Sequence, residues 1–163
     1  MKLTKKISLV FTTLGLCLVS AVASAQVQQV TVSIENIAPI DTVSFAPLRL
    51  GFHSNVFDAF DIGATAGPAI ISVAEGGSGD VWLADFAAAD TTAVVGSVVN
   101  GGPSIPALNA GVGNSFNSTA TATFAVDPSV NPYFTFATMV VPSNDLFLGN
   151  DSAITLFLSL IHI

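Results

Sequence analysis

A strict alternation of apolar and polar side chains constrains the fold of this chain more than any other feature. Val30, Val32 and Ile34 are each separated by one polar residue, and threonines alternate with alanine and phenylalanine over 119–126. A period of two places one set of side chains on a single face of an extended strand, and β-branched residues fit the pleated surface. Both segments are therefore predicted to be half-buried β-strands.

Other segments support the same fold class. The run 133–141 is apolar on both faces and predicts a central strand, and 45–52 and 92–99 predict further strands. Proline at the start and two glycines at the end predict a helix over 68–75. The stretch 81–86 reads as another short strand. Many short strands, Gly/Pro turns and one short helix together predict an all-β, antiparallel β-sandwich.

The first 25 residues have the three parts of a secretory signal peptide. Three lysines precede an apolar stretch over 7–19, and Ala23-Ser24-Ala25 provides a cleavage site of small residues. A membrane anchor is the alternative, but the apolar stretch is shorter than the ~20 residues that a spanning helix needs. We therefore expect a secreted or periplasmic protein that does not span the membrane after cleavage.

Removal of residues 1–25 leaves a chain with a narrow set of ionisable groups. It has no lysine, no cysteine and one arginine, Arg49. Since it keeps all 11 carboxylates, its formal charge is −10. Nucleic-acid binding depends on Lys and Arg that neutralise phosphates, so a nucleic-acid partner is not expected. Disulfides and thiolate metal sites are excluded for want of cysteine.

The last six residues, LSLIHI at 158–163, match a translated sequencing adapter of the transposon-based type. We therefore expect the natural domain to comprise residues 26–157 and to continue beyond them, so that the sandwich is C-terminally truncated. The alternative is a genuine apolar final strand.

Four segments resemble the spondin N-terminal domain family, which includes F-spondin, mindin and many secreted bacterial proteins with one such domain. They are VTVSIENIAP (30–39), LRLGFHSNVFDAFDIGATAGPAI (48–70), AEGG (74–77) and MVVPSNDLFLGND (139–151). Animal members carry Pro-Ser-Pro-Asp-Trp-Phe-Val-Gly-Val-Asp where this chain has PSNDLFLGND. Both aspartates and the glycine keep their spacing, whereas one proline and the tryptophan are replaced.

The resemblance implies a β-sandwich of C2-like topology with a divalent metal site, calcium foremost, near one end. Carried over residue by residue, its ligands are Asp145 and Asp151, with Glu75 from the AEGG segment. Calcium takes six to eight oxygen ligands, so a turn with two carboxylates suits it chemically. The residues alone also allow a different interpretation, in which Asp and Asn only form Asx turns.

Two other groups of residues invite a functional interpretation. Asp58 and Asp61 flank aromatic residues and predict either additional metal ligands or, by preference, solvent-facing acids at a strand edge. His53 lies near Asp and Ser, but no Gly-x-Ser-x-Gly motif accompanies it, so catalysis is not expected.

These features predict a secreted, non-enzymatic β-sandwich that binds calcium and acts in extracellular adhesion or matrix interaction. Its partner would be an extracellular protein or polysaccharide. Two alternatives stay open: a structural surface-layer module without a specific ligand, and a hydrolase of an extracellular polymer that uses paired carboxylates.

Overall fold

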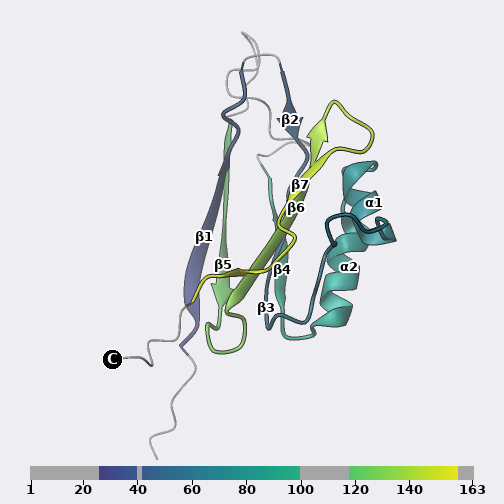
Figure 1. Cartoon of the computed structure of the whole chain (residues 1–163). Helices are drawn as coiled ribbons and strands as arrows, with labels where there is room; N and C mark the ends of the chain where they lie inside the picture. The colour runs from purple at the N-terminus through teal and green to yellow at the C-terminus, as the bar shows by residue number, and fades with distance from the viewer. Residues whose placement is uncertain (1–25, 40–41, 100–117, 158–163) are drawn as a thin grey trace, which may run out of the picture.

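The computed structural model describes residues 26–39, 42–99 and 118–157. The signal peptide predicted over 1–25 and the adapter sequence predicted over 158–163 lie outside these residues. Figure 1 shows the elements, which in chain order are β1 (Gln28–Glu35), β2 (Ser44–Phe45), β3 (Leu48–His53), α1 (Pro68–Ala74), α2 (Asp80–Ala89), β4 (Val94–Val98), β5 (Thr119–Val126), β6 (Tyr133–Val141), β7 (Phe147–Gly149) and β8 (Ile154–Thr155).

Strand β6 is the centre of the larger sheet, as its apolar sequence predicts. Along one edge it pairs with β2 and β3, and β3 in turn pairs with β4. Along the other edge β6 pairs with the short strands β7 and β8. All these pairings are antiparallel. The predicted run 45–52 is split into β2 and β3 around Ala46 and Pro47, because proline cannot donate to the ladder.

The two alternating segments form the second sheet, in which β1 pairs with β5 in antiparallel register. Val30 lies opposite Phe124 and Val32 opposite Ala122, and these half-buried side chains face the larger sheet. They cover a core built around Leu50 and the other buried residues of the group: Leu48, Phe52, Val98, Ala120 and Val126. The predicted half-buried strands are thereby confirmed.

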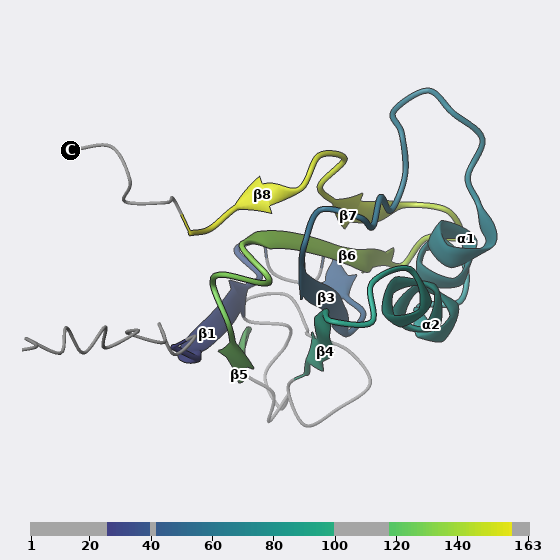
Figure 2. The same ribbon diagram turned by 90° about the horizontal axis from the view of Figure 1, so that it is seen from below.

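The two helices cover the opposite face of the larger sheet (Figure 2). The helix predicted over 68–75 is confirmed as α1, whereas the strand predicted over 81–86 is wrong, since these residues belong to α2. Trp82 and Phe86 lie one turn apart on α2 and are both fully buried. On the helix these two rings lie on one face and pack against Phe57, Ile70 and Val73.

At Gly51 of β3 the ring of Phe86 from α2 approaches the sheet closely. A Cβ atom at this position would lie 2.3 Å from the ring of Phe86, so the absence of a side chain on β3 makes room for that ring.

The predicted antiparallel, β-sandwich-like fold is confirmed, and the described residues contain two helices instead of one. Neither helix in the described part of the chain is long and apolar enough to span a membrane.

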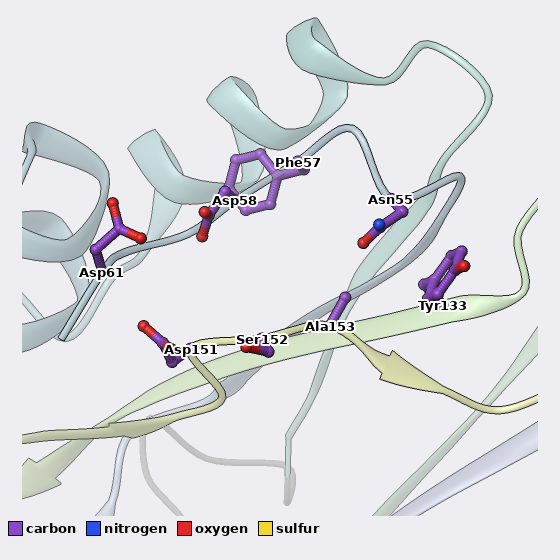
Figure 3. Close-up of a pocket in the computed structure, with 8 residues that line it drawn as sticks. All are labelled: Asn55, Phe57, Asp58, Asp61, Tyr133, Asp151, Ser152 and Ala153. Atoms are coloured by element: carbon purple, nitrogen blue, oxygen red, sulfur yellow. The ribbon is translucent and has the colours of Figure 1, made fainter.

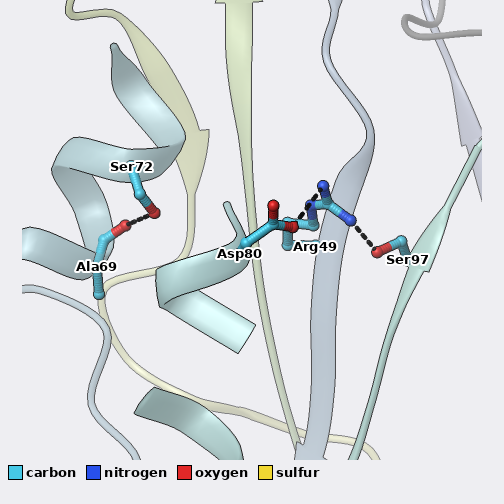
Figure 4. A network of polar contacts seen from close by, with 5 residues as sticks. All are labelled: Arg49, Ala69, Ser72, Asp80 and Ser97. Carbon is cyan, nitrogen blue, oxygen red and sulfur yellow. Dashed lines mark hydrogen bonds and ion pairs between the residues drawn. The ribbon is translucent and has the colours of Figure 1, made fainter. Parts of the chain in front are cut away.

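Arg49 joins α2 to the sheet (Figure 4). Its Nη1 donates to Ser97 Oγ at 2.6 Å, while Asp80, whose side chain is 78% exposed, lies 3.5 Å from Nη2. Figure 4 also shows the Ser72 hydroxyl donating to the Ala69 carbonyl within α1.

We expect Arg49→Met to lower the free energy of unfolding by about 1–2 kcal/mol, because the charged hydrogen bond to Ser97 is lost while the apolar stem is kept. Asp80→Asn should change it by less than about 0.5 kcal/mol, since an exposed ion pair is screened by solvent. Urea denaturation of both variants measures the difference. Equal losses for the two would contradict this assignment.

Candidate functional site

The three side chains predicted as calcium ligands occupy three different places. Asp145 is exposed in the turn between β6 and β7, and Glu75 is exposed at the end of α1. Asp151 is half-buried in the connection between β7 and β8.

Strand β7 keeps Asp145 and Asp151 apart. The Val140 amide donates to the Leu146 carbonyl at 2.8 Å, and the Phe136 amide donates to Asn150 Oδ1 at 2.7 Å. The neighbours of the two aspartates are thus held four residues apart along β6, roughly 13 Å at the rise of a strand. Within the described residues, no three His, Cys, Asp or Glu side chains form a group that could hold a metal ion. The structure therefore does not bring the three predicted ligands into one site.

Asp151 instead shares a cavity of about 380 Å³ with the other two candidate acids, Asp58 and Asp61. Its Oδ1 accepts a hydrogen bond of 2.9 Å from the Ile62 amide, which ties the segment between β3 and α1 to the β7–β8 connection. Figure 3 shows Asp58 and Asp61 on one side of the cavity and Asp151 on the other. The remaining lining residues are Asn55, Phe57, Tyr133, Ser152 and Ala153.

Among the residues that the structure describes, no cationic side chain balances these carboxylates. Residues 26–163 contain no lysine, and their one arginine, Arg49, bonds to Ser97 and Asp80 between β3, β4 and α2. Carboxylates gathered without a cationic partner repel one another, and this repulsion favours the binding of a cation.

The donor chemistry of this cavity suits calcium, but the present spacing does not complete a site. Carboxylate, amide and hydroxyl oxygens are the ligands that calcium prefers, at 2.3–2.6 Å. The three carboxylates are not close enough to form a cluster that could hold an ion directly.

His53, the histidine considered in the sequence analysis, is buried at the end of β3. Its Nε2 lies 2.9 Å from Thr135 Oγ1, and its ring packs edge-on against Phe86. Burial lowers the pKa of the His53 imidazole from its ordinary value of 6.5, and the charge of Asp90 partly opposes this shift. The buried environment of His53 therefore favours the neutral form of its ring.

Asp90, which the sequence did not suggest as important, is buried directly after α2. Its Oδ2 accepts hydrogen bonds from the amide and hydroxyl of Ser54, at 2.9 and 2.7 Å. Its Oδ1 accepts from the amide and hydroxyl of Thr92, at 2.9 and 2.6 Å. Burial alone would raise the pKa of the Asp90 carboxyl, but these four bonds outweigh it and hold the pKa far below 3.8.

Comparison of the chain with protein-family models, curated proteins and solved structures finds no match. Membership of the spondin N-terminal domain family therefore stays a prediction, resting on the four segments that resemble it.

Proposed function

We propose that this chain is a secreted or periplasmic, non-enzymatic β-sandwich module that binds a divalent cation, calcium foremost. One observation carries the proposal: Asp58, Asp61 and Asp151 line one cavity without a cationic side chain to balance them. In this proposal Asp151 stays a ligand, as the spondin-like motif implies, while Asp58 and Asp61 take the places given to Asp145 and Glu75.

The elements around the cavity support a role for the ion in ordering loops. The segment between β3 and α1 reaches the β7–β8 region through the Ile62–Asp151 hydrogen bond and through Phe60, whose ring packs edge-on against Phe147 at 5.0 Å. An ion shared by Asp61 and Asp151 would reinforce that link. The ordered loops would then contact an extracellular protein or polysaccharide, as in adhesion or matrix interaction.

Calcium titration of the chain from residue 26 tests the proposal. Extracellular calcium modules bind with dissociation constants of roughly 0.1–1 mM. At ten times that concentration we expect the free energy of unfolding to rise by about 1.4 kcal/mol, seen as a higher Tm in CaCl₂ than in EDTA. Asp61→Asn combined with Asp151→Asn should abolish the rise, because the cavity loses two negative charges. The side-chain carbonyl oxygen at position 151 can still accept the hydrogen bond from the Ile62 amide.

Asp145→Asn is the matched control, since it removes one carboxylate from an exposed turn that does not line the cavity. Its calcium response should equal that of the unmodified chain. If Asp145→Asn abolished the rise in Tm with calcium and the double variant kept it, the calcium site would instead lie at the β6–β7 turn. No response at 10 mM calcium would reject the metal proposal and favour a structural surface-layer module.

A further inference from the structure

A strained turn follows β3 and opens the segment that forms one wall of the carboxylate-lined cavity. Asn55 has a φ of 74°, a left-handed conformation that residues other than glycine adopt uncommonly. Asn55 also lines the cavity. Its amide donates to Nδ1 of His53 at 3.2 Å, and this bond holds the turn closed.

The two hydrogen bonds of His53 define its tautomer. Since Nδ1 accepts the proton of the Asn55 amide, the ring proton of the neutral imidazole lies on Nε2, which donates to Thr135 Oγ1. A second ring proton would have to be placed on Nδ1. The protonated Nδ1 and the Asn55 amide would then be two donors that face each other. The Asn55 amide would therefore lose the ring nitrogen as its hydrogen-bond acceptor.

We propose that protonation of His53 opens the Ser54–Asn55 turn and loosens the segment that follows it, so that the shape of the cavity depends on pH. The device needs no bound cation and so stands independently of the function proposed above. His53 is 0% exposed, so the charged ring has no water to solvate it in place. Breaking the Asn55 bond removes the constraint on the strained residue and lets the ring reach solvent.

The groups that face His53 set the direction of the switch. Asp90 lies in the α2–β4 connection, and its four hydrogen bonds keep it ionised. Tyr133 lies on β6, and its ring centre is 6.2 Å from that of His53. Phe86 of α2 contributes only an apolar edge. Because burial lowers the pKa of His53 and the charge of Asp90 only partly restores it, the ring takes its second proton at a lower pH than an exposed histidine does.

The loosening stays local because the segment has other attachments. Phe57 stacks on Phe86 with ring centres 3.9 Å apart, and Ile62 is bonded to Asp151. We therefore expect Asn55 and the residues up to Phe57 to respond to pH, while β6 stays intact.

Amide hydrogen exchange of the uniformly labelled protein between pH 7.5 and 5.0, followed by NMR, tests the proposal. After correction for the intrinsic exchange rate, protection of the Asn55 amide should fall at least tenfold on acidification, with protection of Ala137 in β6 unchanged. His53→Asn is the matched variant: its side-chain oxygen replaces Nδ1 as acceptor from residue 55 but does not titrate. Protection at Asn55 in this variant should not depend on pH.

A measurement on the unmodified chain covers the case in which His53→Asn does not fold. The ring signals of His53 and the amide signal of Asn55 should titrate with one shared midpoint. Different midpoints, an equal pH response in His53→Asn, or a parallel loss of protection at Ala137 would each overturn the proposal.

Discussion

Phe86→Ala should lower the free energy of unfolding by about 3–5 kcal/mol, the range found for buried aromatic residues replaced by alanine. The Phe86 ring is fully buried, stacks on Phe57 and meets Trp82 edge-on at 5.0 Å. It also fills the space above Gly51, so its removal leaves a cavity between the helices and the sheet. Urea denaturation followed by circular dichroism measures the loss.

Val81→Ala is the control for this prediction, because Val81 lies on the same helix but is 42% exposed. Its loss should stay below about 1 kcal/mol. A loss for Phe86→Ala as small as that of Val81→Ala would mean that α2 does not pack on the sheet through this ring.

Asp90→Ala is expected to cost about 3 kcal/mol or more, since it removes the acceptor of four hydrogen bonds in a buried position. The amides of Ser54 and Thr92 would lose their partners, and the end of β3 would lose its link to the start of β4. Asp85→Ala, an exposed acid on α2, should change the free energy of unfolding by less than about 0.5 kcal/mol. Equal effects for the two variants would contradict the role assigned to Asp90.

The same carboxylate gives stability a pH dependence of defined sign. The folded-state pKa of Asp90 lies far below its ordinary value of 3.8, so the unfolded chain binds the proton first as the pH falls. The contribution of Asp90 to stability is therefore complete above about pH 4–5 and is lost progressively below it. Asp90→Asn, which keeps the shape but does not titrate, should show a shallower fall in Tm between pH 5 and pH 3. A fall as steep as in the unmodified chain would count against this interpretation.

The strands were the part of the fold that could be predicted from sequence, because alternation and β-branching act locally. Val30, Val32 and Ile34 face the core as expected, and 133–141 is the central strand. The helix α2 was missed because Val81, Trp82 and Phe86 have high strand propensity. The packing of Trp82 and Phe86 against Phe57, which is distant in sequence, favours the helix instead.

The candidate site could be predicted only in part, for a geometric reason. Asp145 and Asp151 are near each other in sequence, but the extended strand β7 between them carries their side chains to different levels of β6. Asp61 and Asp151 are 90 positions apart, and their segments are joined by the hydrogen bond from the Ile62 amide to Asp151 Oδ1, which no local sequence pattern predicts. Asp90 was missed for a similar reason, since its bonds to Ser54 depend on β3 and α2 ending side by side.

The pairing of β1 with β5 has a consequence for how the chain acquires its structure. Within the described ranges, residues 28–35 pair only with residues 119–126, so β1 stays without this partner until β5 has been formed. Closing so long a loop adds little to the equilibrium cost, because each doubling of loop length costs only about 0.6 kcal/mol. It does slow the search, since non-local pairings retard folding far more than they weaken the product. Because the pairing of β3 with β6 is similarly distant in sequence, we expect both sheets to form late in folding.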